Sequence, residues 1–271
     1  MPEGHAIHRL AGDLNRSFAG RQVQSSSPQG RFVAGAALLD GATLSAAEAI
    51  GKHLFISFDH TPERVHIHLG LYGRFAIVHE SGLPVKGAVR WRLESGETTA
   101  DLRGPTACAL LDDIAVAHIR ARLGPDPIRA DAEPDRAWLR ISRSRSPIAT
   151  LLMDQRVLAG VGNIYRAEVL FRHEIDPFMP GSGLSRQEWN DVWADLAALM
   201  KAGAVTGRID TVRAEHEPEA MGRPPRHDNH GGEVYVYRRA SMDCLVCGTP
   251  VRTQSLANRR LFWCPRCQPR R

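Results

Sequence analysis

The sequence predicts an α+β protein of three domains, because three different patterns follow one another along the chain. Up to about residue 115, apolar and polar residues often alternate, as in antiparallel strands with one buried face. Beyond the stretch Leu123–Pro127, apolar residues recur at helical spacing. The final segment holds two Cys-x2-Cys pairs. We therefore expect an N-terminal antiparallel β-sandwich (1–123), a helical domain (124–233) and a four-cysteine zinc-finger hairpin (234–271).

The predicted sandwich begins with a short helix, which ends at Gly20. Its apolar residues have helical spacing: Ile7, Leu10 and Leu14. Three strands are then predicted within 53–59, 65–69 and 89–93, where every second residue is apolar, and a Ser95-Gly96 turn follows the last of them.

The helical domain begins after Leu123-Gly124-Pro125-Asp126-Pro127, a sequence that is unfavourable for a helix. Ser185 and Glu188 form a capping box, with Leu184 and Trp189 placed as the hydrophobic staple, and we expect this helix to stop near Gly203. Residues 207–233 are polar and rich in Pro and Gly, so we expect a long flexible loop.

The cysteine spacing is the most specific single pattern of the chain. Cys244, Cys247, Cys264 and Cys267 have the Cys-x2-Cys-x16-Cys-x2-Cys spacing of a zinc ribbon, which we favour over two redox pairs. Four cysteine ligands leave no open position on the metal, so we expect one structural Zn²⁺. Arg259 and Arg260 lie between the two pairs, where a hairpin tip is expected. Cys108 is outside this pattern, and we expect it to be a small core residue.

The charge of the chain is compatible with a polyanionic partner. The net charge is +5, and residues 234–271 contain eight arginines against the single Asp243, although charge runs of this kind are also found on ordinary solvated surfaces. No apolar stretch approaches the length of a membrane span, and the N-terminus lacks a secretory signal pattern. We therefore expect a cytoplasmic protein.

The start of the chain offers a candidate nucleophile. Removal of Met1 would give Pro2 a free secondary amine beside the carboxyl group of Glu3. A helix beginning just after this point would disfavour the protonated amine. The amine is then a candidate to attack C1′ of a sugar, with Glu3 as general acid, although Met-Pro-Glu also begins many unrelated chains by chance. Lys52, after Gly51 at the entry to a strand, is a candidate phosphate ligand.

Two further patterns are less specific. Gly160-Val161-Gly162-Asn163 fits a tight turn between two helices whose amides bind a DNA phosphate, or an ordinary Gly/Asn turn. His66 and His68 lie on one face of a predicted strand. For this pair we favour packing or hydrogen bonding over metal binding, because no further ligand lies nearby in the sequence.

Together, these motifs resemble the bacterial DNA glycosylase/AP lyase family of formamidopyrimidine-DNA glycosylase and endonuclease VIII. The resemblance covers essentially the whole chain in the family's order: Pro2-Glu3, Gly51-Lys52, the segment 151–165 and the zinc ribbon. It implies that 124–233 is a helix–two-turns–helix DNA-binding domain. It also implies a monomer that binds double-stranded DNA containing oxidised bases or abasic sites. The lesion would be flipped out of the duplex, excised through a Schiff base, and the strand cut by β,δ-elimination.

The resemblance also implies a role for each candidate residue. Pro2 would be the nucleophile, Glu3 the proton donor and Lys52 a phosphate contact beside the lesion, while Asn163 and Arg259 would bind the DNA backbone. Gly70-Leu71-Tyr72 resembles the endonuclease VIII wedge, so Leu71 and Tyr72 would fill the space that the flipped nucleotide leaves.

Two details bear on the lesion and on the activity. The wedge resembles endonuclease VIII, and Asp101–Pro105, with its single Arg103, lacks the double-Arg, Phe loop with which the 8-oxoguanine branch probes the opposite cytosine. We therefore favour oxidised pyrimidines over oxidised purines such as formamidopyrimidine and 8-oxoguanine. Ala6 stands where the family usually has a second Glu, which puts the efficiency of base excision in doubt and keeps a non-catalytic damaged-DNA-binding protein as an alternative.

Overall fold

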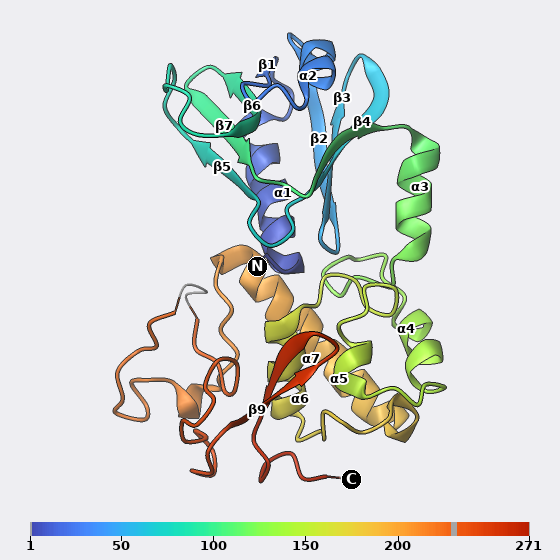
Figure 1. The fold of residues 1–271 in the computed structure, drawn as a ribbon, viewed down its shortest axis with the longest axis vertical. Helices are drawn as coiled ribbons and strands as arrows, with labels where there is room; N and C mark the ends of the chain where they lie inside the picture. Colours follow the sequence, from blue (N-terminus) through green and yellow to red (C-terminus); the bar gives the residue numbers. More distant parts are fainter. Residues whose placement is uncertain (1, 229–231, 271) are drawn as a thin grey trace. The chain divides into compact units, whose positions relative to one another are not determined.

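The computed structural model describes residues 2–228 and 232–270, which form two compact units with a boundary between Arg122 and Leu123 (Figure 1). The first unit contains two four-stranded antiparallel sheets, and the second contains helices and a two-stranded hairpin. The predicted α+β class, with its sandwich, its helical region and its cysteine hairpin, is confirmed. No helix in the described ranges combines the length and the apolar character that a bilayer span requires.

The first unit places one helix before its strands and one after them. Its elements are α1 (Gly4–Phe18), β1 (Gln24–Ser26), α2 (Val33–Leu39), β2 (Leu44–Ile50), β3 (His53–Phe58), β4 (Thr61–His68), β5 (Arg74–Val78), β6 (Val89–Ser95), β7 (Thr98–Arg103), β8 (Ala107–Leu111) and α3 (Asp113–Arg122). One sheet has the order β2-β3-β4-β8 and the other the order β1-β6-β7-β5.

The core of the first unit is filled from both sheets and from α1. The fully buried Trp91 packs against three phenylalanine rings. The distances between ring centroids are 5.6 Å to Phe32, 6.3 Å to Phe58 and 5.9 Å to Phe75. The predicted alternation in β3 is present, but Phe55 on its other face is also buried. The ring of His66 stacks on Phe55 at 5.2 Å, which covers a side that the sequence pattern predicted to be open.

The second unit combines short helices, one long helix and the hairpin. Its elements are α4 (Pro134–Ile141), α5 (Ile148–Leu151), α6 (Asn163–Arg172), η1 (Gly181–Gly183), α7 (Arg186–Thr206), η2 (Ala214–His216), β9 (Arg252–Leu256) and β10 (Arg259–Trp263). Helices and hairpin share one apolar core, in which the rings of Phe178 and Trp263 meet edge to face at 5.0 Å. The domain boundary near residue 233 remains a prediction.

The long helix α7 begins as predicted and ends later than predicted. Ser185 accepts a hydrogen bond from the Glu188 amide (3.2 Å), and the Glu188 carboxylate accepts one from the Ser185 amide (2.8 Å), which confirms the capping box. The predicted stop near Gly203 is wrong, because Gly203 is buried within the helix. Gly207, with φ of 76°, takes the left-handed conformation that ends it.

The polar segment 207–233 is a long loop whose two ends are fixed. The Thr211 amide donates to the Glu233 carbonyl (2.8 Å), and the Glu233 amide donates to the Asp210 carboxylate (2.8 Å). The Arg213 amide also donates to the Tyr235 hydroxyl (2.8 Å). Hydrogen bonds therefore hold both ends of the loop. The loop has little regular structure, as predicted, and its flexibility stays a prediction.

Candidate active site

Pro2 and Glu3 lie directly before the first turn of α1. The helix starts at Gly4, and Glu3 is its extended N-cap residue, with φ of −101° and ψ of 177°. The positive end of the helix dipole is thus directed at the residues preceding it, as the sequence predicted. Glu3 is almost completely buried, and its carbonyl accepts the first helical hydrogen bond, from the Ala6 amide (3.0 Å). Met1 lies outside the described residues.

Ala6 occupies the third position of this helix, where a capping-box residue normally stands. A glutamate there would place a carboxylate near the N-cap. In this chain the first turn has no acidic residue, and the side chain of Glu3 makes no capping hydrogen bond. Relative to the family pattern, this chain therefore lacks a carboxylate at the helix start, next to the candidate nucleophile.

Lys52 lies in the tight turn between β2 and β3. Ile50 pairs with His53 in the ladder, so Gly51 and Lys52 form a two-residue turn, and Gly51 supplies the positive φ (58°) that such a turn requires. The turn is held from β4, because His68 Nδ1 lies 2.9 Å from the Lys52 carbonyl oxygen, to which it donates. This contact fixes the backbone that carries the lysine.

Pro2 and Lys52 lie towards the same end of the first unit. The Gly20 amide binds the Leu44 carbonyl, and Asn15 Nδ2 binds the Ala47 carbonyl (both 2.9 Å), so α1 runs opposite to β2. From Asn15 back to Pro2 the helical path is about 20 Å, and from Ala47 on to Lys52 the strand path is about 17 Å. Figure 1 shows the start of α1 and the β2–β3 turn at this end.

The wedge candidates belong to the same end of this unit. Ile67 pairs with Leu54, so β4 finishes beside the start of β3, and the loop after His68 follows there. Leu71 is about half exposed (47%) and Tyr72 is almost fully exposed (90%). A Cβ on Gly70 would meet Thr106 Oγ1 at 1.9 Å, so glycine is needed where this loop packs against the segment before β8.

His66 and His68 form a cluster with His53. His53 Nδ1 lies 2.8 Å from His66 Nε2, and the ring of His53 stacks with both others at 5.1 and 4.9 Å. The preference for packing and hydrogen bonding is confirmed. Sequence reasoning missed His53, which belongs to the neighbouring strand. Within the described residues, the four cysteines are the one group of three or more candidate ligands that converge on a single point.

In the second unit, Asn163 opens α6 directly after the predicted glycine turn. Its side chain is largely buried and bridges two segments: Oδ1 accepts from Arg166 Nη2 (2.5 Å), and Nδ2 donates to the Arg260 carbonyl (2.9 Å). Gln155 holds the turn itself, accepting from the Gly160 amide (3.0 Å) and donating to the Val161 carbonyl (2.9 Å). A phosphate ligand in such a turn was expected to point its side-chain amide outward, and this expectation is wrong: the Asn163 amide is buried and links α6 to the hairpin.

The hairpin places Arg259 beside its tip, as predicted. Leu256 pairs with Arg259, and the two residues between them, Ala257 and Asn258, have positive φ values of 49° and 58°, as in a type I′ turn. Arg259 and Arg260 are exposed. Because the Arg260 carbonyl binds Asn163, the glycine turn and the arginines of the hairpin lie close together.

The four cysteines converge as a metal site requires. Their sulfur atoms all lie within 4.8 Å of one another, with Cys244 and Cys267 3.8 Å apart and Cys247 and Cys264 3.5 Å apart. A tetrahedral ion with Zn–S bonds of about 2.3 Å needs S···S distances of about 3.8 Å, so the set fits Zn²⁺. Gln268 braces it: its Oε1 accepts from the Cys264 amide (3.1 Å), and its Nε2 donates to the Ile175 carbonyl (2.9 Å).

Comparison with known proteins agrees with this geometry. Three family models match: the formamidopyrimidine-DNA glycosylase N-terminal domain at residues 1–108, its H2TH domain at 123–214, and the zinc finger found in FPG and IleRS at 244–270. Over 99% of this chain and 100% of the relative, the chain is 51% identical to Endonuclease 8 1 of Mycobacterium tuberculosis. The chain belongs to the formamidopyrimidine-DNA glycosylase family.

Other members are more distant in sequence and share the fold. A formamidopyrimidine-DNA glycosylase of Parasynechococcus marenigrum is 30% identical over 99% of both chains. A solved structure of Lactococcus lactis Fpg with DNA containing an abasic site has a TM-score of 0.78 at 17% identity, covering 99% of this chain and 100% of that one. MutM in complex with DNA containing carbocyclic 8-oxo-G has a TM-score of 0.79 at 19% identity. This chain is thus a DNA glycosylase with AP lyase activity, of the type that acts in base excision repair.

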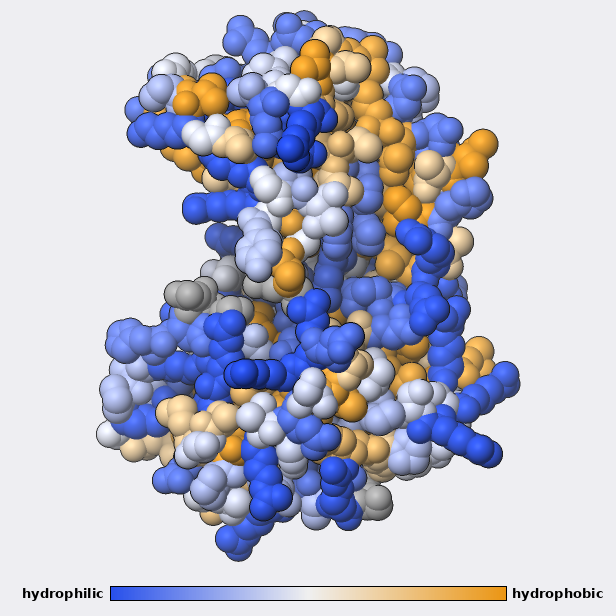
Figure 2. All heavy atoms as spheres, viewed as in Figure 1, coloured by the Kyte–Doolittle hydropathy of each residue, from blue (hydrophilic) through white to orange (hydrophobic). Residues whose placement is uncertain are grey.

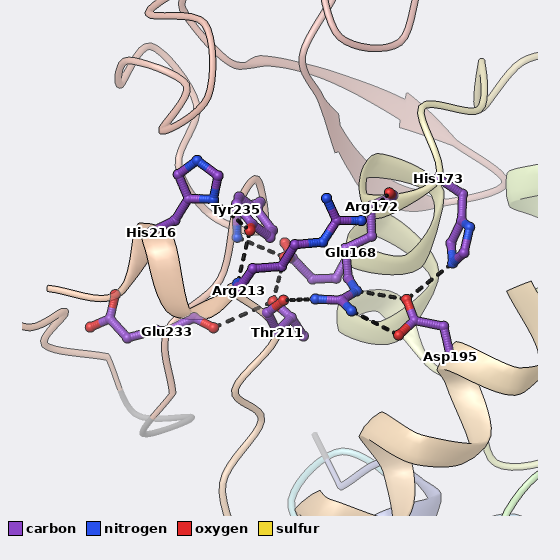
Figure 3. A network of polar contacts seen from close by, with 9 residues as sticks. All are labelled: Glu168, Arg172, His173, Asp195, Thr211, Arg213, His216, Glu233 and Tyr235. Atoms are coloured by element: carbon purple, nitrogen blue, oxygen red, sulfur yellow. Dashed lines mark hydrogen bonds and ion pairs between the residues drawn. The ribbon is translucent and has the colours of Figure 1, made fainter. Parts of the chain in front are cut away.

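Sequence reasoning missed a buried acidic residue of this glycosylase. Glu168, in α6, is fully buried, and its carboxylate accepts from the Tyr235 amide (2.6 Å) and the Thr211 hydroxyl (2.6 Å) (Figure 3). It also accepts from the amides of Val236 (2.9 Å) and Tyr237 (2.8 Å). It fixes the chain that leads from the long loop into the zinc finger. The sequence offered one signal, an acidic residue on an otherwise apolar helix face.

A second part of the same network fixes the start of the loop. The carboxylate of Asp195, in α7, accepts from Arg172 Nε (2.6 Å) and lies 3.1 Å from His173 Nε2 (Figure 3). Arg172 also donates to the Thr211 carbonyl. Burial would raise the pKa of Asp195, but the hydrogen bonds from His173 and Arg172 outweigh it and lower that pKa to about 2.

Proposed function

We propose that this glycosylase removes oxidised bases through a Schiff base on Pro2 and then cuts the strand by β,δ-elimination. The observation that carries the proposal is the start of α1, where a secondary amine would directly precede a buried glutamate at the positive end of a helix. An α-amino group titrates near pH 8, well below a lysine side chain, so a substantial fraction is uncharged and nucleophilic in the cell.

The chemistry assigns one step to each group. The Pro2 nitrogen bonds to C1′, while the base leaves with the electrons of its bond to C1′, and Glu3 donates a proton to the ring oxygen or to the departing base. The nitrogen then loses its own proton, and the bond between C1′ and the protonated ring oxygen breaks, so that the nitrogen lone pair forms the C1′ iminium. The resulting iminium withdraws electrons from the sugar. Loss of a C2′ proton then expels the 3′ phosphate, and a second elimination expels the 5′ phosphate.

The other residues at this end of the first unit position the substrate. We assign Lys52 to a phosphate beside the lesion, because a tight turn presents it and His68 holds its backbone. Leu71 and Tyr72 are apolar and exposed on a braced loop, as residues must be if they are to fill the gap left by a flipped nucleotide.

In the second unit we assign Asn163 and Arg259 to the DNA backbone. One hydrogen of the Asn163 amide is used by the Arg260 carbonyl, and the amide has a second one for a phosphate oxygen. Arg259 is exposed next to the tip of a short hairpin that the metal site stabilises. When bound, Zn²⁺ would be held by Cys244, Cys247, Cys264 and Cys267 and would act structurally.

For the lesion, we favour oxidised pyrimidines over formamidopyrimidine and 8-oxoguanine. The Leu71-Tyr72 wedge and the sequence of Asp101–Pro105 support this choice, as do the relatives named Endonuclease 8 1. The purine alternative retains support from the relatives named formamidopyrimidine-DNA glycosylase. We propose a monomer that acts on chromosomal DNA in the cytoplasm.

Borohydride trapping tests the nucleophile. The mature protein should form a covalent adduct with duplex DNA containing an abasic site or thymine glycol, and mass spectrometry should place the bond on Pro2. Two extra residues before Pro2 should abolish the adduct, whereas the same two residues added after Arg271 should leave it intact. An adduct on another residue, or unchanged trapping with the blocked N-terminus, would overturn the proposal. Binding without an adduct or strand scission would favour the non-catalytic alternative.

A further inference from the structure

The arginines of the second unit differ in whether a carboxylate neutralises them. Many form ion pairs: Arg129–Asp131, Arg156–Asp154, Arg172–Asp195, Arg186–Asp135, Arg208–Asp210, Arg223–Glu233, Arg226–Asp228 and Arg270–Asp176. Among the described residues, no such pair involves Arg140, Arg143 or Arg145, and all three side chains are exposed. These three are called the α4–α5 arginines below.

The α4–α5 arginines stand on a fixed turn and not on a loose loop. Arg140 is in the last turn of α4, and the chain then folds back, with the Ser144 amide bound to the Ile141 carbonyl (3.0 Å). The η1 segment holds the rest, because the Ser182 amide binds the Ser144 carbonyl (2.8 Å) and the Gly181 amide binds the Ser146 carbonyl (3.0 Å). A defined backbone therefore carries three charges that form no ion pair with a described carboxylate.

This turn lies near the residues that carry Asn163. The hydrogen bond from Arg156 is the main cause that lowers the pKa of Asp154, and the charge of Arg140 contributes too, so Arg140 lies within electrostatic range of Asp154. The next residue, Gln155, holds the glycine turn that precedes Asn163. Ten residues lead from Arg145 to Gln155, of which only the four of α5 are helical, so the chain path between them is at most about 26 Å. One turn of B-DNA measures about 34 Å, so a duplex at Asn163 has phosphates within that distance.

We propose that Arg140, Arg143 and Arg145 bind phosphates of the duplex beyond the damaged nucleotide, forming a second backbone contact on the helical region. The inference rests on the proposed role of Asn163 in DNA binding. Guanidinium groups suit phosphate, and contacts of this kind add affinity without reading the sequence. Much of the visible surface of the second unit is hydrophilic (Figure 2), so polarity alone does not single out these arginines.

The test is a charge-matched comparison of two triple variants. One carries Arg140→Gln, Arg143→Gln and Arg145→Gln. The control carries Arg129→Gln, Arg186→Gln and Arg208→Gln, which removes the same charge from arginines that are paired with aspartates. Binding to a duplex of about 30 base pairs with an abasic-site analogue is measured across a salt series. Counterion release predicts that each lost phosphate contact lowers the slope of log K against log salt by about 0.9.

We expect the first variant to lower this slope by about 2 to 3 and to bind roughly 10- to 100-fold more weakly near physiological salt, with the control close to wild type. Cleavage at saturating DNA should stay unchanged. Equal slopes for the two variants would overturn the inference and leave the arginines as solvated charges. If the triple variant fails to fold, Arg143→Gln alone should lower the slope by about 0.9. Trapping at Pro2 by wild-type protein tests the proposed function independently, so the two failures can be distinguished.

Discussion

The candidate residues of the first unit and those of the second are positioned by different physical means. In the first unit the conformation of the backbone positions the candidate residues. Pro2 precedes a helix start, Lys52 lies in a tight turn that depends on Gly51, and Tyr72 extends from a loop that packs closely at Gly70. The side chains themselves stay accessible in part, and Tyr72 is 90% exposed.

In the second unit, buried polar contacts position the candidate residues instead. Asn163 is held at both ends of its amide, Glu168 binds three successive backbone amides, and four cysteines converge on one metal position. Such networks specify one arrangement when every member is satisfied. The candidate residues of the first unit are thus placed by simple turns and a helix start, whereas those of the second unit come from distant segments and are tied together by buried contacts. The first unit should therefore keep its stability when the second unit is destabilised.

Among the changes considered, loss of the metal should disrupt the buried contacts of the second unit most. Structural zinc contributes roughly 10 to 16 kcal/mol to the folding of zinc-finger peptides, so Cys264→Ser should release the hairpin and lower DNA affinity by about 100-fold or more. Because Leu261 and Phe262 belong to the shared core, the helices around them should also lose stability. Hydrogen exchange should show faster opening in the second unit and unchanged protection in the first.

Cys108→Ser is the matched control, because Cys108 lies in β8 of the first unit and outside the cysteine cluster. It should keep its zinc and its DNA affinity. Equal destabilisation of both units by Cys264→Ser would contradict the division of roles between them.

Glu3→Gln addresses the chemistry of the first unit and should have the next largest effect. General acid catalysis contributes about 100- to 10,000-fold, so single-turnover excision of thymine glycol should slow by that factor. Cleavage at a preformed abasic site should fall less, since no base remains to be expelled. Glu97→Gln, at the β6–β7 turn, serves as control. Equal loss on both substrates would show that Glu3 acts on another step.

Acidification should lower the folding stability of the first unit, and this effect should be smaller than those of the two substitutions above. Burial, followed by the charges of His68 and His66, lowers the pKa of His53 from 6.5 to about 3, and burial and His68 lower that of His66 to about 4. Below about pH 6.5 the unfolded chain therefore binds protons that the folded unit does not, so stability falls as the pH drops and is fully present above that pH.

Between pH 6.5 and 5 this loss should be on the order of 1 kcal/mol per histidine, after allowance for partial exposure. Urea unfolding of the first unit at several pH values measures it. His66→Gln should flatten the dependence in this range, where most carboxylates stay charged, whereas His60→Gln on the exposed β3–β4 turn should not. The same slope in both variants would remove the histidine cluster as the cause.

Local patterns predicted much of this molecule correctly. Helical spacing, strand alternation, the capping box and the cysteine spacing each depend on residues close in sequence, and the corresponding elements are present. Properties that depend on distant partners were not predictable in this way. Nothing near Glu168 in sequence indicates that its partners are the amides of 235–237, and His53 joins His66 only through strand pairing.

The late end of α7 has a similar explanation. Gly203 looks like a helix terminator in sequence, but tertiary packing buries it within the helix, and Gly207 supplies the left-handed residue instead. The fixed ends of the loop 207–233 likewise depend on Asp195 and Tyr235, which lie outside that segment.

The bond between Asn163 and the hairpin is made to the main-chain oxygen of residue 260. Any amino acid supplies that oxygen, so substitutions at 259 and 260 leave this hydrogen bond in place. Evolution, or a protein engineer, can therefore alter the charge and reach of the hairpin tip while its anchor stays constant. The affinity for DNA could then change while the fold that positions the hairpin stays the same.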